Sequence, residues 1–198
     1  MTKITTYLFA FLTLFSLSSC SSGGDEPSPP TAPELVAQGW QSYVSKDYQS
    51  ALDKFTQAIG LDGGFVDAYN GAGWAQAKLN RLSNSLTSFT TGHGKDSTNL
   101  EINAGMAIVL SAQHNYAQSA LHATAVITAQ PGWSFSHDAT LSTADLHLLL
   151  AEDYFAMANY SSSLAEVKLL NSTFDADILT VAGKTLLAQE IERLRSLV

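Results

Sequence analysis

Cysteine is nearly absent from this chain, since Cys20 is the only one among 198 residues. A single thiol excludes an intramolecular disulfide and a zinc site built from cysteines. The five histidines show no compact ligand spacing such as HExxH, so the sequence predicts no metal site. The chain also has no glycine-rich phosphate loop and no GxSxG motif. We therefore predict no catalytic residues, no cofactor and no enzymatic activity.

Basic residues are scarce as well. Ten Lys and Arg stand against eighteen Asp and Glu, and the formal net charge is −8. Binding to a phosphate backbone needs clustered Lys and Arg, so we predict no nucleic-acid partner. The acidic balance is compatible with basic or neutral partners. A hydrophobic content of 45% with only 14% charged residues predicts that most of the chain folds.

The chain lacks an apolar run long enough for a membrane span. The longest one, residues 4–17, is broken by Thr and Ser, whereas a span needs roughly 20 apolar residues. Lys3 precedes this run and small residues follow it. That order of charged, apolar and small residues is typical of a secretory signal.

The residues Leu17-Ser18-Ser19-Cys20 at its end resemble a bacterial lipobox. The resemblance implies a signal peptide over 1–19, cleavage before Cys20, and acylation of the thiol and the new amino group, as in palmitate-bearing lipoproteins. The alternative is an ordinary signal with a chance cysteine. Ser21 would favour the outer membrane under a sorting rule of some Gram-negative bacteria. The expected product is secreted and lipid-anchored, facing the periplasm or the cell surface.

A linker follows the anchor. Residues 21–33 read SSGGDEPSPPTAP, a composition that cannot form a packed core and that favours an extended chain. We therefore assign 20–31 to the lipid anchor and flexible linker.

The remaining chain has a period of 34 residues. Large side chains recur 34 positions apart at Tyr48, Leu82 and Tyr116. Small side chains recur in the same way at Ala51, Ser85 and Ser119. A fourth unit, ANYSSSLAEVKLLNS, places Tyr160 in the same role after an insertion of ten residues. Self-similarity at such a period is the signature of a repeat architecture.

This pattern resembles the tetratricopeptide repeat (TPR), because the first unit carries the family's small and aromatic residues in order: Gly39, Tyr48, Ala51, Phe55 and Ala58. The resemblance implies an all-α, helix-turn-helix solenoid of about four repeats over 32–175. Repeat arrays need an end helix with one polar face, and we assign 176–198 to this C-terminal cap helix. The alternative is an unrelated helical bundle.

Two units depart from the family pattern, and two helix starts can be predicted. Ala123 stands where an aromatic residue belongs, and Gly92 followed by His93-Gly94 predicts an early end for the second helix of unit two. Residues 98–101 (TNLE) have the spacing of a capping box, and 142–145 (STAD) have an acidic version of it.

In TPR arrays the first helices of the repeats line a concave groove. Carrying the family's groove positions onto this chain gives a ligand-binding set of Trp40, Tyr43, Asp67, Asn70, Trp74 and Glu101. The same positions elsewhere hold Ala77, Ile108 and Asp145. Exposed Trp and Tyr are typical interface anchors, and aromatic faces beside carboxylates suit Lys or Arg. The expected partner segment is therefore apolar with basic residues. The alternative is that Trp40 and Trp74 pack against each other between adjacent repeats.

The insertion GWSFSHDATLST (132–143) places Trp133 and Phe135 in a loop. These aromatics either mark a binding surface or fold back over an edge of the core, and we favour the second interpretation. One family subclass is excluded, because the chaperone-carboxylate clamp needs Lys and Asn where this chain has Val36, Trp40 and Gly71.

The resemblance thus implies a membrane-anchored scaffold or adaptor that holds another envelope protein. The alternative function is binding of an extracytoplasmic peptide or glycan in the aromatic groove.

Overall fold

The computed structural model describes residues 28–197, within which nine α-helices and one two-stranded sheet follow in order. The helices are α1 (Ala32–Val44), α2 (Tyr48–Leu61), α3 (Val66–Lys78), α4 (Leu82–Lys95), α5 (Leu100–Ala112), α6 (Tyr116–Ala129), α7 (Thr143–Ala156), α8 (Tyr160–Leu170) and α9 (Val181–Arg195). The strands are β1 (Ser134–Phe135) and β2 (Asp138–Ser142), which pair antiparallel.

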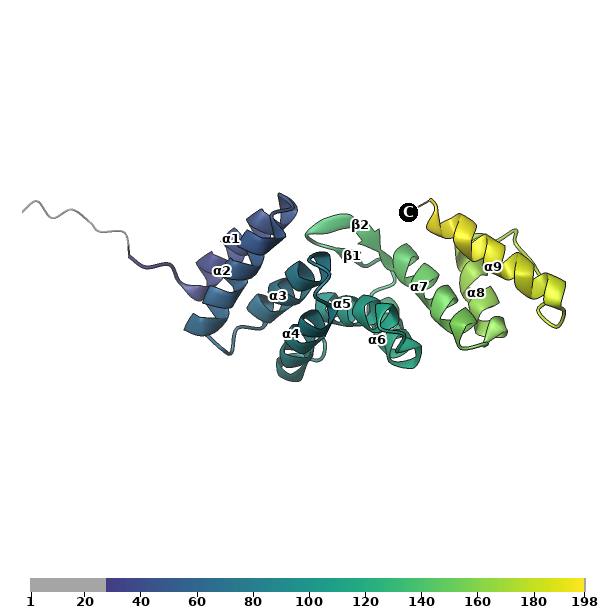
Figure 1. Cartoon of the computed structure of the whole chain (residues 1–198), viewed down its shortest axis with the longest axis horizontal. Helices are drawn as coiled ribbons and strands as arrows, with labels where there is room; N and C mark the ends of the chain where they lie inside the picture. Colours follow the sequence, from purple (N-terminus) through teal and green to yellow (C-terminus); the bar gives the residue numbers. More distant parts are fainter. Residues whose placement is uncertain (1–27, 198) are drawn as a thin grey trace, which may run out of the picture.

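The helices follow one another along an arc (Figure 1). The helices α1, α3, α5 and α7 each pack on the next helix in the chain, and they also contact one another in turn. The hairpin of β1 and β2, hereafter the hairpin, lies on the inner side of the arc. This arrangement confirms the predicted all-α, TPR-like solenoid with four helix pairs and a C-terminal cap helix, α9.

The period of the sequence is visible in the backbone. Lys46, Asn80 and His114 have φ of 63°, 57° and 62°, and each follows the first helix of a repeat. Ala158, with φ of 59°, has the same role 44 positions after His114, which matches the ten-residue insertion. Asn and His tolerate this left-handed conformation, whereas Lys and Ala adopt it rarely. The turn geometry is therefore imposed by the packing of the helix pair.

Buried phenylalanine rings hold successive repeats together. Phe89 of α4 is fully buried between Gly73 of α3 and Gly105 of α5. A Cβ added to Gly73 would lie only 2.5 Å from the Phe89 ring. Phe55 of α2 lies in the same way against Gly39 of α1, at 2.6 Å from such a Cβ. The glycines that the sequence pattern marks as packing positions are thus required by the close approach of a ring to a helix backbone.

The third repeat is packed with other side chains. Ala123 replaces the ring and Ala107 replaces the glycine, each 34 residues after its counterpart, Phe89 or Gly73. Both alanines are fully buried. Ala123 is smaller than its counterpart Phe89, and Ala107 is larger than its counterpart Gly73. The two changes offset each other, so the unit departs from the family pattern without losing its core.

The predicted early end of α4 is wrong, because α4 continues through Gly92 to Lys95. The N–H of Asp96 donates to the Gly92 carbonyl at 2.9 Å, so the helical hydrogen bonds run to the end. A Cβ on Gly92 would lie 2.8 Å from Ile102 Cδ1. This glycine lets α5 approach α4 and does not break the helix.

One of the two predicted capping boxes forms. Ser142 and Asp145 make it at the start of α7, where the Ser142 N–H donates to Asp145 Oδ2 at 2.8 Å. The box predicted for residues 98–101 is wrong, because Asn99 is the N-cap of α5 and accepts from the Ile102 N–H at 3.0 Å. Asn caps helices as well as Thr does, and Glu101 is released for other contacts.

The core has two parts that meet at α7. A continuous cluster extends from α1 to α7, and a second one joins α7, α8 and α9. From the C-terminal segment, Leu187, Ile191 and Leu194 are buried in the second cluster, as expected for a cap helix. Among the described helices, none is both long and apolar enough to cross a membrane. Cys20 and the predicted signal peptide lie outside the described residues.

Asp153 of α7 is a buried carboxyl at the joint between the third and fourth repeats. Its side chain is fully buried, and Oδ1 accepts a hydrogen bond from Ser111 Oγ at 2.5 Å, while Oδ2 has no protein partner. Burial raises the pKa of Asp153 above its usual value, and the nearby hydroxyls of Ser111 and Ser119 offset part of that shift. The folded protein therefore holds this proton more tightly than the unfolded chain.

Replacing Asp153 with asparagine is expected to raise the free energy of unfolding at pH 7 by about 1–3 kcal/mol, the usual cost of an unsatisfied buried group. In the parent, this carboxyl lowers stability as pH rises from its ordinary pKa to its raised one, with no further loss above. The advantage of Asp153→Asn should therefore grow with pH and then level off. Urea unfolding of both proteins from pH 4 to 8 measures it, and a variant less stable than the parent at pH 7 would contradict this explanation.

Candidate interaction groove

The six groove residues predicted from the sequence come together on the inner face of the arc. Trp40 and Tyr43 lie on α1. Asp67, Asn70 and Trp74 lie on α3, and Glu101 lies on α5. The tip of the hairpin enters the space between them. We call this set the hairpin groove: Trp40, Tyr43, Asp67, Asn70, Trp74 and Glu101.

Aromatic rings form the floor of the hairpin groove. Phe135 stacks on Trp74 with ring centroids 4.4 Å apart, and it meets Trp40 and Tyr43 edge-on at 6.0 Å each. His137 lies parallel to the Trp40 indole at 3.6 Å. Phe135 thus lies between the two tryptophans, so neither predicted arrangement, open aromatics or direct Trp–Trp packing, describes the site.

The two tryptophans are accordingly buried. Trp40 is 6% exposed and Trp74 is 3% exposed. Trp133 and Phe135 of the insertion are 4% and 1% exposed, which is the predicted fold-back over the core. Sequence periodicity could not show this contact, because the hairpin lies outside the 34-residue pattern.

A chain of hydrogen bonds connects three repeats beside these rings. The Trp40 indole N–H donates to Asp67 at 3.2 Å, and the Asn70 amide donates to Asp67 at 3.2 Å and to Glu101 at 2.7 Å. Glu101 in turn accepts from the Ser136 hydroxyl at 2.6 Å and from its backbone N–H at 3.3 Å. The predicted acidic edge of the groove therefore binds the hairpin of the same chain.

Three buried polar atoms of the hairpin groove have no protein partner. They are the Tyr43 hydroxyl, the Trp74 indole Nε1 and the Asn70 Oδ1. Burial raises the pKa of Tyr43 well above its usual range, so its phenol stays neutral. Burial lowers the pKa of His137, and the carboxylates of Glu101 and Asp67 oppose that shift.

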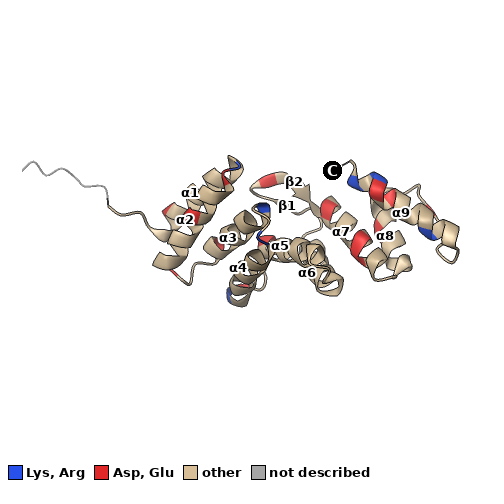
Figure 2. Cartoon of the chain, in the orientation of Figure 1, with Lys and Arg blue, Asp and Glu red and all other residues tan. Residues whose placement is uncertain are grey.

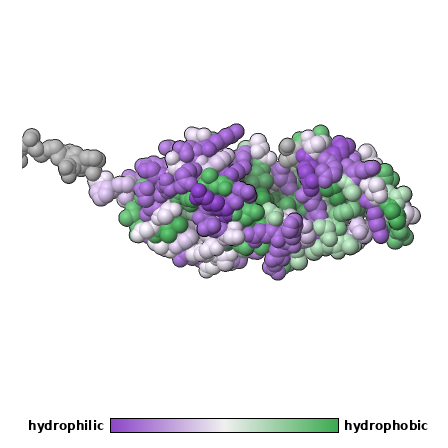
Figure 3. Space-filling view, in the orientation of Figure 1, coloured by the Kyte–Doolittle hydropathy of each residue, from purple (hydrophilic) through white to green (hydrophobic). Residues whose placement is uncertain are grey.

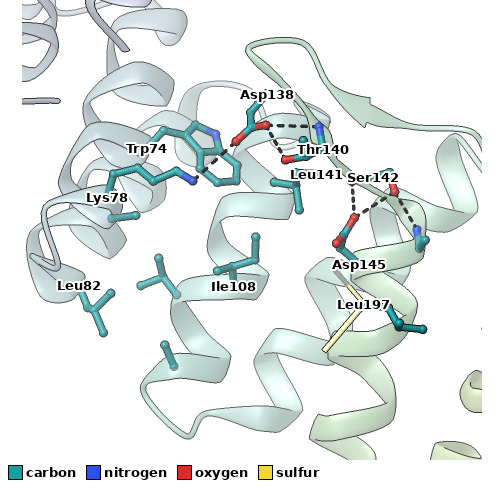
Figure 4. A pocket seen from close by; sticks show the side chains of 14 residues that line it. Trp74, Lys78, Leu82, Ile108, Asp138, Thr140, Leu141, Ser142, Asp145 and Leu197 are labelled. Atoms are coloured by element: carbon teal, nitrogen blue, oxygen red, sulfur yellow. Dashed lines mark hydrogen bonds and ion pairs between the residues drawn. The ribbon is translucent and has the colours of Figure 1, made fainter. Parts of the chain in front are cut away.

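An open pocket of about 730 Å³ lies on the other side of β2. Figure 4 shows side chains from α3, α4, α5, α7 and β2, together with Leu197, around it. Its size falls in the usual range for ligand sites. The larger apolar side chains lining it are Trp74, Leu82, Ile108, Val109, Leu141 and Leu197.

Charged side chains stand at the rim of this pocket. Lys78 and Asp138 lie 3.7 Å apart, and both are partly exposed, so the pair contributes little to stability. Asp145, the third residue of α7, lies beside them and completes the capping box with Ser142. Figure 2 marks acidic residues on the hairpin and along α7. Figure 3 shows hydrophobic patches set among hydrophilic ones on the face in view.

The sequence identified only part of the pocket. Trp74, Ala77, Ile108 and Asp145 occupy family groove positions and do line it. Leu141 and Leu197 were missed, because one belongs to the inserted hairpin and the other follows the cap helix. Neither position belongs to the repeat pattern.

Titratable side chains elsewhere form pairs. His147 of α7 and Glu166 of α8 lie 2.7 Å apart, and His93 faces His122 with ring centroids 5.4 Å apart. Among residues 28–197, no three His, Cys, Asp or Glu side chains are grouped as a metal site would require.

No known protein family and no curated protein sequence matches this chain. Its fold, however, matches solved structures. The MamA protein superposes with a TM-score of 0.60 at 11% identity, over 69% of each chain. A tetratricopeptide repeat protein from Parabacteroides merdae gives 0.59 at 14% identity, over 83% of this chain and 60% of that one.

A third structure is the first TPR of Spaghetti (RPAP3) bound to the HSP90 peptide SRMEEVD. It gives a TM-score of 0.56 at 12% identity, over 65% of this chain and 94% of that one. Identities this low show the fold alone. The helix pairs, the 34-residue period of the turns and these superpositions together show that the chain has the tetratricopeptide-repeat fold.

Proposed function

We propose that this chain is a lipid-anchored interaction scaffold of the bacterial cell envelope. A segment of another envelope protein would bind in the pocket on the inner face of the arc. The observation that carries this proposal is the 730 Å³ apolar pocket, whose walls come from the first helices of three repeats. The lipobox resemblance at Cys20 and the linker after it support attachment to the membrane, and Ser21 supports the outer membrane.

The chemistry of the pocket favours a particular partner. Its apolar walls suit one or two large apolar side chains. At the rim Lys78 pairs with Asp138, and Asp145 leaves one net negative charge that suits a basic residue. The peptide bound to the first TPR of Spaghetti is acidic at its end. The rim of the present pocket favours a basic segment instead, which agrees with the absence of the carboxylate-clamp residues from this chain. We therefore propose an apolar segment that carries Lys or Arg.

A glycan ligand is less well supported. Sugar binding in the aromatic groove would need an open aromatic face. His137 covers one face of Trp40, and Phe135 stacks on Trp74. A peptide that inserts side chains into the pocket needs no such face.

Changing Ile108 to arginine is expected to reduce recovery of the partner at least about thirtyfold, the equivalent of losing one hot-spot contact of about 2 kcal/mol. The reason is that Ile108 lies on the pocket wall, so a buried guanidinium would replace an apolar contact. The measurement is affinity capture by the full-length protein from solubilised envelope, quantified by mass spectrometry.

Leu121→Arg is the matched control, because Leu121 is 63% exposed on α6 and lines none of the pocket. Circular dichroism verifies that both variants are folded. Loss of a protein with Ile108→Arg but not with Leu121→Arg supports the proposal. Equal recovery by both variants and the parent contradicts it.

A further inference from the structure

The tip of the hairpin makes the contacts that a bound peptide would make. Phe135 is an aromatic anchor between two indoles, and Ser136 gives both its backbone N–H and its hydroxyl to Glu101. His137 then stacks on Trp40. Three consecutive residues therefore bind side chains of α1, α3 and α5, which are far from them in the sequence.

Outside the hairpin groove, the hairpin is anchored mainly at its base, where Trp133 is 4% exposed and Leu141 packs against the core. Its two strands are short, and their register is irregular between Ser134 and Phe135. Its base is fastened by Thr143, which donates to the carbonyls of Trp133 and Pro131 at 3.0 Å each. A lone two-stranded hairpin is marginally stable in water, so the groove contacts are what hold the tip in place.

The hairpin satisfies this groove incompletely. The Trp74 indole N–H, the Tyr43 hydroxyl and the Asn70 carbonyl oxygen are buried without a protein partner. Each of these residues is at least nine-tenths buried. Polar atoms placed in this way match the main-chain carbonyl and N–H groups of an extended peptide, because one is a donor, one an acceptor and one can be either.

We propose that the hairpin groove is a peptide-binding site, that the hairpin occupies it in cis, and that a partner segment competes for it. The occupant is an extended segment with an aromatic residue, then a hydroxyl residue, then an imidazole or cationic residue. These are the side chains that Phe135, Ser136 and His137 place on the tryptophans and on Glu101. This site shares Trp74 and strand β2 with the pocket containing Ile108, but its test uses the isolated hairpin peptide and Glu101, which does not line that pocket, so its failure is distinguishable from failure of the proposed function.

A synthetic copy of residues 132–140, GWSFSHDAT, is the probe. In the full-length chain, the double variant Phe135→Ala/His137→Ala empties the groove while keeping the hairpin. Calorimetric titration is expected to show that the peptide binds this variant at least tenfold more tightly than it binds the parent. Adding Glu101→Gln should weaken that binding at least fivefold, and a scrambled peptide should not bind. Equal affinity for parent and variant, or no effect of Glu101→Gln, would overturn the proposal.

Hydrogen exchange on the unmodified full-length chain gives a second test that does not depend on the folding of a variant. With the synthetic peptide in excess, the Ser136 amide, which donates to Glu101, is expected to exchange at least tenfold faster than without the peptide, because the peptide displaces the tip. An unchanged exchange rate of this amide would show that the hairpin is a fixed wall, and the proposal would be rejected.

Discussion

Replacing Phe89 with alanine is expected to lower the free energy of unfolding by about 3–5 kcal/mol, the range for a buried ring in a core that cannot collapse around the cavity. Phe89 is fully buried, and its ring lies edge-on to Trp74 with centroids 5.6 Å apart. It also fills the space over Gly73 and Gly105. These three contacts join α4 to α3 and α5, so the loss affects two repeats at once.

Urea denaturation measures this loss, with Leu121→Ala as the control because that side chain is 63% exposed. The control should change stability by no more than about 0.5 kcal/mol. Gly105→Ala alone should destabilise the protein by overpacking against Phe89, but it should cost less when Phe89→Ala is present. A loss below about 1 kcal/mol for Phe89→Ala, or additive effects in the double variant, would show that the ring does not fill this space.

Changing Cys20 to serine is expected to abolish acyl labelling of the protein and its cleavage before residue 20. The lipobox resemblance implies cleavage before Cys20 and acylation of its thiol and of the new amino group, and the variant has no thiol. The consequence for anchoring is large, because each buried CH₂ contributes about 0.8 kcal/mol and a single chain binds only reversibly. Several chains on Cys20 would hold the protein firmly.

Metabolic labelling with palmitate, followed by mass spectrometry of the mature N-terminus, gives the result. Ser22→Ala is the control, since it changes the linker and leaves the thiol intact. An unlabelled parent protein, or an N-terminus other than Cys20, would favour the alternative of an ordinary signal with a chance cysteine.

The fold could be predicted from the sequence because each repeat uses the same packing contacts. Each repeat must place small residues where helices cross and a large one between them, so Gly39, Phe55, Gly73 and Phe89 recur at fixed spacing. The left-handed turns at Lys46 and Ala158 were not predictable from residue type, because neither residue favours that conformation. Their conformation is a consequence of the helix pair.

The candidate site could be predicted from the sequence only in part, because one of its components lies outside the repeats. The six residues of the hairpin groove do come together, but their partner in the structure is a hairpin from the insertion. An inserted segment is used once, so it leaves no periodic signal. Glu101 shows the limit most clearly, since its spacing from Thr98 is typical of a capping box while its carboxylate binds Ser136. Whether the hairpin groove binds a ligand in trans stays a prediction.

The most direct test of the central claim, that the inner face of the arc binds a partner protein, is site-specific photo-crosslinking in cells that make the full-length protein. One variant carries the photoreactive residue at Ile108 in the pocket, and the other at Leu121 on the exposed face of α6. We predict a discrete crosslinked envelope protein from position 108 and none from position 121. Absence of a crosslink from position 108, or the same products from both positions, would contradict the claim.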